Sequence, residues 1–132
     1  MIGNKKNYED ITINGMKQVE QKKKKIEYLK LENGKSPIVN WLNSLDKSIY
    51  LRIIKRLIRI EEGNYGDCKK LVDNELFEIR FDFGKGYRIY YVELDEIILL
   101  LVNGGDKSTQ TRDIQNAQNL LNKWRLENEK KI

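Results

Sequence analysis

Residues 75–102 read ELFEIRFDFGKGYRIYYVELDEIILLLV. Apolar and polar side chains alternate over Glu75–Phe83, which is the period of a strand with one buried face. The glycines of Gly84-Lys85-Gly86 suit a three-residue hairpin loop, and Tyr87–Leu94 then forms the return strand. A second tight turn leads to the continuous apolar run Ile97–Val102, which is typical of a strand buried on both faces. The stretch therefore predicts three antiparallel strands.

The length of the hairpin loop determines which residues face each other across the two strands. With a three-residue loop, Asp82 faces Arg88 and Arg80 faces Tyr90 on the side of the sheet away from the core. Arg80 and Arg88 are then diagonal neighbours on one surface.

Helical patterns flank this sheet. Spacing and capping residues predict one helix over Pro37–Leu45 and a second that is capped by Asp46 and ends at Glu62, together forming a helical hairpin. A short alternation over Ile26–Glu32 predicts a first strand, and a sharp loop over Asn103–Lys107 leads to a last helix over Ser108–Leu126. This order predicts an α+β fold, in which an antiparallel sheet of three to four strands has an N-terminal helical hairpin and a C-terminal helix on one side.

The chain divides into an extension and one domain. A length of 132 residues suits a single core. Residues 1–25 lack a sustained apolar period and contain seven lysines, so we expect a poorly ordered, lysine-rich extension before a domain over 26–132. Most of the formal net charge of +5 lies in that extension. The run Lys22–Lys25 is either a solvated tail or an arm that attracts phosphate.

Several kinds of chemistry are excluded by composition. Histidine is absent, which removes Ser-His-Asp and Cys-His nucleophiles and His-ligated zinc. Cys68 is the single cysteine, which excludes an intrachain disulfide and a cysteine-based zinc site. The aspartates at 46, 67, 106 and 113 are scattered, so we expect no metal or cofactor. The longest apolar run has six residues and no leader peptide is evident, which predicts a soluble cytoplasmic protein with no membrane partner.

Two arginines are the first candidates for a functional site. Guanidinium groups of Arg80 and Arg88, held on a rigid sheet, can donate to several oxygens of a phosphate during transfer. Alternatively, they only neutralise Glu78 and Asp82 on a solvated surface.

Three lysines and a tyrosine extend this candidate site. Lys69 and Lys70 lie in the loop that enters the first hairpin strand, and Lys107 lies where a helix N-terminus favours anions. Converging cations lower each other's affinity for a proton, which would allow one lysine to act as a base. Tyr90 is a core residue by default, although it could stack on an RNA base from the arginine surface.

These residues fall within motifs that stand in a fixed order. The motifs are GNYGDCK at 63–69, EIR at 78–80, GKGYRIY at 84–90, and GGDKSTQ at 104–110 followed by Asp113-Ile114. In order and spacing the sequence resembles the HigB-like branch of the RelE/ParE toxin superfamily, over roughly residues 26–124. The resemblance implies a RelE-like domain and the toxin of a type II toxin-antitoxin system, silenced by a cognate helix-turn-helix antitoxin and reaching operator DNA only through it.

The resemblance also implies a reaction and roles for residues. The family cuts mRNA on the ribosome without a metal: the 2'-hydroxyl of the substrate attacks the adjacent phosphate and yields a 2',3'-cyclic phosphate and a 5'-hydroxyl. By position, Arg80 would stabilise the phosphorane and Arg88 would be a second phosphate ligand. Lys69 or Lys70 would be a cationic base or clamp, and Lys107 would assist the leaving oxygen. The tyrosine or histidine that relatives carry near the last helix is missing from 106–113.

The sequence is also compatible with two functions other than an endoribonuclease. One is a ParE-like toxin that poisons gyrase without cutting RNA, and another is an inactive toxin that acts only as a partner of its antitoxin. A basic helix surface made of Arg52, Lys55, Arg56 and Arg59 could bind an acidic antitoxin segment or ribosomal RNA, or could simply be solvated.

Overall fold

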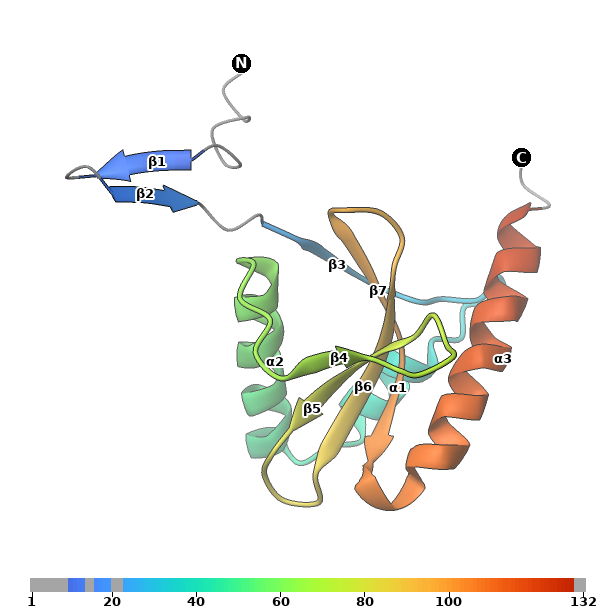
Figure 1. Cartoon of the computed structure of the whole chain (residues 1–132). Coiled ribbons are helices and arrows are strands. Elements are labelled where there is room, and N and C mark those ends of the chain that lie inside the picture. Colours follow the sequence, from blue (N-terminus) through green and yellow to red (C-terminus); the bar gives the residue numbers. More distant parts are fainter. Residues whose placement is uncertain (1–9, 14–15, 20–22, 130–132) are drawn as a thin grey trace.

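The computed structural model describes residues 10–13, 16–19 and 23–129. Its centre is a five-stranded mixed sheet with strand order β3-β7-β6-β5-β4 (Figure 1). The strands are β3 (Lys25–Tyr28), β4 (Cys68–Lys70), β5 (Phe77–Phe81), β6 (Tyr87–Glu93) and β7 (Ile98–Asp106). β3 runs parallel to β7, and the other neighbours pair antiparallel.

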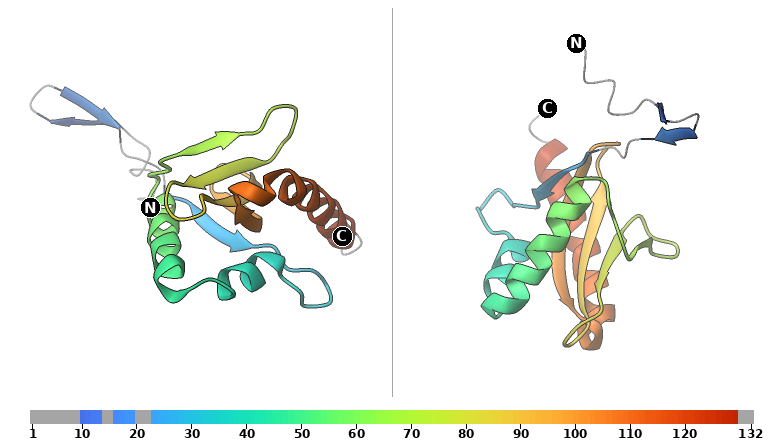
Figure 2. Two further views of the ribbon diagram at one scale, coloured as in Figure 1. Left: turned by 90° about the horizontal axis from the view of Figure 1, so that it is seen from below. Right: turned by 90° about the vertical axis from the view of Figure 1, so that its left-hand side faces the viewer.

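Helices cover both faces of this sheet. α1 (Pro37–Asn43) and α2 (Lys47–Glu61) pack on one face, and a 3₁₀ turn, η2 (Lys107–Thr109), leads into α3 (Gln110–Glu129) on the other. Figure 2 shows that α1 and α2 follow each other around a corner. Within the described ranges, no helix is long and apolar enough to cross a membrane.

The predicted α+β class is confirmed, and its details need correction. The sheet has five strands, because β4 forms inside the segment expected to be a loop and β3 joins the opposite edge. That edge is parallel, and no tight turn joins its two strands, because α1, α2 and strands β4 to β6 lie between β3 and β7 in the chain. The predicted helical hairpin does not form as an antiparallel pair, and the helices lie on two faces rather than one (Figure 2).

The predicted lysine-rich extension contains a small sheet of its own. β1 (Asp10–Ile13) and β2 (Met16–Val19) pair antiparallel, and the rest of residues 1–22 lies outside the described ranges. The end of the lysine run belongs to the domain: the backbone N–H of Lys24 donates to the Glu61 carbonyl at 2.7 Å, and Lys25 begins β3. Lys22 lies outside the described residues.

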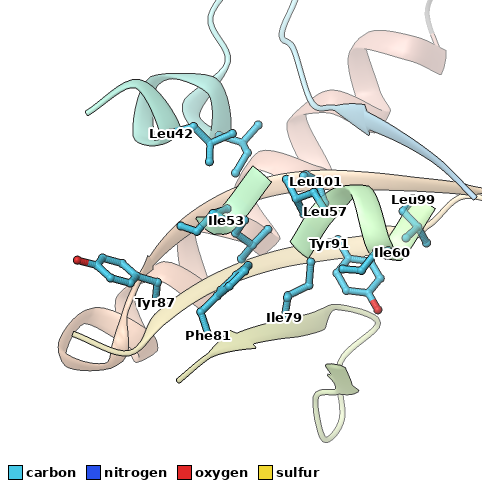
Figure 3. Close-up of a cluster of buried hydrophobic side chains, with 12 residues drawn as sticks. Leu42, Ile53, Leu57, Ile60, Ile79, Phe81, Tyr87, Tyr91, Leu99 and Leu101 are labelled. Carbon is cyan, nitrogen blue, oxygen red and sulfur yellow. The ribbon is translucent and has the colours of Figure 1, made fainter. Parts of the chain in front are cut away.

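Each face of the sheet has its own apolar core. On the α1 and α2 face, Ile53 and Leu57 pack against Ile79 and Leu101 (Figure 3). On the α3 face, Ala117 and Leu121 pack against the sheet and against Leu29 and Leu31, which follow β3. Ile114 and Trp124 of α3 also pack against this second core. Burial on both faces explains the unbroken apolar run in β7.

The β5–β6 pairing is shifted by two residues from the predicted register. β5 ends at Phe81 and β6 begins at Tyr87, so five residues connect them instead of three. Phe83 leaves the ladder because its ring packs on the rings of Phe81 and Tyr87. An even shift leaves every side chain on its predicted face, but it changes the partners. Arg80 faces Arg88 directly, rather than Tyr90.

The sharp loop predicted over Asn103–Lys107 is wrong, because β7 continues to Asp106. Its two glycines serve close packing rather than a turn. A Cβ at Gly104 would collide with the ring of Trp41 from α1, and a Cβ at Gly105 would collide with the carboxylate of Asp113 from α3. Glycine therefore lets helices approach the same strand from both sides.

Candidate functional site

The two predicted arginines are direct neighbours on the α3 face of the sheet. Arg80 and Arg88 are a cross-strand pair, so their Cβ atoms lie on the same side of the pleat. Glu78 and Tyr90 form the next pair on that side. Like charges placed opposite each other are unfavourable unless carboxylates or an anion balance them.

Arg88 is buried and held in place by its neighbours. Its side chain is 8% exposed, and its Nε lies 3.8 Å from Oε2 of the fully buried Glu78. A terminal guanidinium nitrogen donates to the backbone carbonyls of Gly86 at 3.2 Å and Tyr87 at 3.1 Å. Gln110 of α3 donates to the same Glu78 oxygen at 2.5 Å. The contacts orient the guanidinium, while its Nε has no hydrogen-bond partner within the described part of the chain.

Arg88 lines a pocket of about 280 Å³ beside the hairpin loop. The lining residues are Asp82, Phe83, Gly84, Lys85, Gly86, Arg88 and Lys107. Three cations and one carboxylate therefore surround the pocket. Its positive excess suits a phosphate oxygen, and the carboxylate can accept a proton.

Lys107 reaches this pocket because the start of α3 is anchored on β7. Oδ1 of Asp106 accepts hydrogen bonds from the Ser108 hydroxyl at 2.6 Å and from the Ser108 N–H at 2.8 Å, which cap the turn and lower the pKa of the Asp106 carboxyl. The Thr109 hydroxyl donates to Asp113, whose carboxylate lies against Gly105. Gly105 is in turn the cross-strand partner of Arg88. Asp106 is therefore the cap of the turn that leads into α3.

Arg80 occupies a more open position than Arg88. Its side chain is 35% exposed, and its Nε lies 3.4 Å from a carboxylate oxygen of Asp67. Lys69 is exposed and pairs with Glu78, so it shares the arginine face. Lys70 pairs with Phe77 and therefore lies on the opposite face. The pleat of β4 thus removes Lys70 from the predicted site.

Tyr90 does not fit the stacking role considered for it. Its side chain is fully buried beneath α3, because Ala117 and Leu121 close over this part of the sheet. Burial, followed by the nearby charge of Glu78, raises the pKa of its hydroxyl. Tyr90 is a core residue and offers no face to a nucleotide base.

The arginines of α2 divide into two roles. Arg56 is a structural clamp, since it donates to the carbonyl of Arg80 at 2.6 Å and to that of Tyr65 at 3.1 and 3.3 Å. Arg52 and Arg59 are exposed and line a cleft with it, whereas Lys55 is exposed outside that cleft.

Sequence reasoning missed the place of Lys85 at the pocket and the burial of Glu78. The sequence pattern makes Lys85 a loop residue, yet it lines the pocket with Arg88. Asp82 was expected to face Arg88 as a strand residue, and it lines the same pocket from the five-residue connection instead. The same pattern makes Glu78 a solvent-side counter-ion, yet it is fully buried. The available signal was its place between apolar residues on both sides of a strand that α3 covers.

The site contains no recognisable metal-binding arrangement in the described residues, where no group of three or more His, Cys, Asp or Glu side chains could hold an ion. What it can offer a ligand is charge and hydrogen-bond donors. The arrangement of Arg88, Lys85 and Lys107 around one pocket favours an anion.

A protein-family model and a curated protein both match this chain. The family model described as "Phage derived protein Gp49-like (DUF891)" matches residues 40–122. A curated relative, an uncharacterized protein of Haemophilus influenzae (strain ATCC 51907 / DSM 11121 / KW20 / Rd), is 40% identical over 80 residues, which cover 60% of this chain and 80% of the relative. The matched range includes the two sheet arginines and the start of α3.

Proposed function

Because the chain belongs to the phage-derived Gp49-like family, a toxin-like family related to the RelE and HigB addiction modules, we propose that it is a toxin that cuts mRNA on the ribosome. Family membership suggests the toxin of a toxin-antitoxin pair and implies an antitoxin partner. That the toxin cleaves mRNA, and that it does so on the ribosome, is our own proposal.

One observation supports the endoribonuclease proposal above others. Arg88 and Lys107 line the same pocket although they come from β6 and from the start of α3. Arg80 is the direct cross-strand neighbour of Arg88. Cations fixed by a sheet and a capped helix can stabilise the extra negative charge of a phosphorane with little reorganisation.

The proposed reaction needs no metal, because its nucleophile belongs to the substrate. The 2'-oxygen forms a bond to phosphorus as the bond from phosphorus to the 5'-oxygen breaks. Arg80 and Arg88 bind the non-bridging oxygens, and Lys107 donates a proton to the leaving 5'-oxygen. Lys69, on the same face, is a clamp for the RNA backbone.

Asp82 takes the role of base in this proposal. An ionised carboxylate accepts a proton at neutral pH, whereas an exposed lysine ammonium must first lose one. Asp82 is the one carboxylate that lines the pocket among the described residues. Asp82→Asn should therefore slow cleavage more than Lys69→Gln does.

The proposal is tested by incubating the purified chain with ribosomes and mRNA and mapping the new ends. We expect 5'-hydroxyl and 2',3'-cyclic phosphate ends, and a rate about 100-fold lower for Lys107→Met, as is usual for the loss of one charge-stabilising donor. Lys107 is exposed, so its replacement leaves the core unchanged. Arg125→Gln, which removes a charge near the far end of α3, is the control and should cut normally.

Other outcomes distinguish the alternative functions. Intact mRNA together with inhibited DNA supercoiling would replace the nuclease by a gyrase-binding toxin. Intact mRNA with normal supercoiling and undisturbed growth would leave only a partner for the antitoxin.

A further inference from the structure

A second cationic cleft lies on the other side of the β5–β6 connection. It has a volume of about 210 Å³ and is lined by Arg52, Arg56, Arg59, Phe81, Asp82 and Phe83. α2 supplies the three arginines, one turn apart, and β5 with its loop supplies the two rings. The guanidinium of Arg52 lies 3.8 Å from the ring centre of Phe83, and that of Arg56 lies 5.1 Å from the ring centre of Phe81.

The arginines of this cleft differ from Arg80, Arg88 and Arg125 in having no paired carboxylate within the described ranges. Arg80 and Arg88 on the sheet and Arg125 on α3 each have an acidic partner. In the described part of the chain, none of the three cleft arginines forms an ion pair. Asp82 lines the cleft but is not within ion-pair distance of these arginines. A cleft with three arginines and one unpaired carboxylate still favours an anion.

The cleft adjoins the proposed reaction pocket. Asp82 and Phe83 line both, so the two sites meet along the same two residues of the connection. A row of cationic side chains therefore extends from Arg59 and Arg52 in the cleft, past Phe83, to Lys85 and Arg88 in the pocket. Aromatic rings between cations that follow one another are typical of surfaces that hold single-stranded nucleic acid.

We propose that the α2 cleft binds the phosphate of a neighbouring nucleotide in the same RNA strand whose cleavage we assign to the first pocket. Arg52 and Arg59 donate to that phosphate, and Arg56 supplies charge from a fixed position, because backbone carbonyls hold its guanidinium. Phe83 separates the two phosphate positions and offers part of its ring to the intervening nucleotide. The inference rests on the proposed function for the identity of its ligand.

The experiment measures binding rather than cleavage. A fluorescent 2'-O-methyl RNA hexamer, which cannot be cut, is titrated with the full chain at salt concentrations of about 50 to 200 mM. We expect Arg52→Gln combined with Arg59→Gln to weaken binding about tenfold at low salt, since each arginine contributes charged hydrogen bonds. The slope of log affinity against log salt should become shallower by about 0.7 for each phosphate that the protein no longer neutralises.

A matched variant separates this site from general charge. Lys30→Gln combined with Lys35→Gln removes the same charge from the loop between β3 and α1, where both lysines are exposed, and should leave the slope unchanged. Thermal unfolding verifies that both double variants are folded. An equal slope for all three proteins would overturn the inference, as would unchanged RNA affinity accompanied by weaker binding of the antitoxin.

Failure of this inference and failure of the proposed function give different results. If Lys107→Met abolishes mRNA cleavage while the Arg52 and Arg59 variant binds RNA normally, the reaction stands and the second phosphate site does not. If no mRNA is cut but hexamer binding depends on Arg52 and Arg59, the cleft binds RNA and the reaction does not stand.

Discussion

The two faces of the central sheet differ in whether they bury polar and charged side chains. Beneath α1 and α2 the buried side chains are apolar, and the phenol oxygens of Tyr87 and Tyr91 point to the margin of the cluster (Figure 3). Beneath α3 lie all the buried charged and polar residues of the described chain, namely Glu78, Arg88, Asn103 and Asp113. Both faces contribute stability by packing, and the α3 face in addition retains polar groups that packing alone would not select.

The polar face is the one that adjoins the proposed site. Replacing a buried ion pair by apolar residues often leaves stability unchanged or raises it. The presence of Glu78 and Arg88 beneath α3 is therefore better explained by what the guanidinium does at the pocket than by its contribution to folding.

The largest effect is expected when this pair is broken on one side only. Glu78→Ala leaves Arg88 buried without its carboxylate and should lower the free energy of unfolding by about 3–5 kcal/mol. Urea denaturation measures this loss.

The corresponding double replacement sharpens the comparison. Glu78→Leu with Arg88→Met removes both charges, and its free energy of unfolding should lie within about 1 kcal/mol of the parent or above it. The same protein should no longer cleave mRNA. If the double variant is as unstable as the single one, the polar face is structural and the contrast between the faces is lost.

On the apolar face, shortening a buried side chain should destabilise the protein, and there is no charged partner whose replacement would restore the stability. Ile79→Ala removes a fully buried side chain between α2 and the sheet and should cost about 3 kcal/mol, the usual loss when a large core residue leaves a cavity. Ile79→Val should cost about 1 kcal/mol in the same urea experiment. A similar loss for both variants would indicate that this core rearranges rather than holding a cavity.

Alkaline pH should affect both faces through their tyrosines. Burial raises the pKa of Tyr91 on the apolar face and of Tyr90 on the polar face, and it raises the pKa of Tyr65 to about 12. Above about pH 10 the unfolded chain loses these protons and the folded chain keeps them, so stability falls as pH rises. Stability measured between pH 9 and about 12 should fall less steeply in Tyr91→Phe. A parallel course for variant and parent would contradict this reasoning.

The smallest effect is expected at the far end of α3. Arg125 forms two hydrogen bonds of 2.6 Å with Glu75, and both side chains are largely exposed. Arg125→Ala should therefore change the free energy of unfolding by less than about 1 kcal/mol. The arginine lowers the pKa of Glu75, so its small contribution is present at neutral pH and fades as acid protonates the carboxylate. A loss above about 2 kcal/mol, beyond the usual range for an exposed pair, would mean that α3 is held by its end rather than by its buried side.

Local sequence patterns predicted the individual strands and helices better than they predicted which strands pair with each other. The alternation of β5 and β6 and the stripe of α2 follow from side chains a few residues apart, and both were correct. The parallel pairing of β3 with β7 joins residues that lie far apart in the sequence, such as Lys25 and Ile98, and no local signal specifies it. Tyr90 was given as a core residue by default, which its burial confirms, but the sequence alone could not exclude the stacking role, since that depends on where α3 packs.

The sequence predicted the positions of some candidate residues and not of others. Alternation correctly placed Arg80 and Arg88 on one face, and the motif order placed Lys107 at a helix start. The opposite faces of Lys69 and Lys70 could not be predicted, because their segment was expected to be a loop and not a strand. Asp82 was expected beside Arg88, whereas the closeness of Lys85 to Arg88 depends on a connection whose length the glycines did not reveal.

The five-residue connection between β5 and β6 also constrains how relatives of this protein can diverge. Because side chains alternate with a period of two, insertions or deletions there are tolerated in pairs. A single added residue that shifted β5 against β6 would turn Arg80 toward α2 and bring Ile79 and Phe81 beneath α3, while Arg88 would stay on its face because β6 also pairs with β7. We therefore expect loop lengths in the family to differ by even numbers, or an odd change to be absorbed by a bulge.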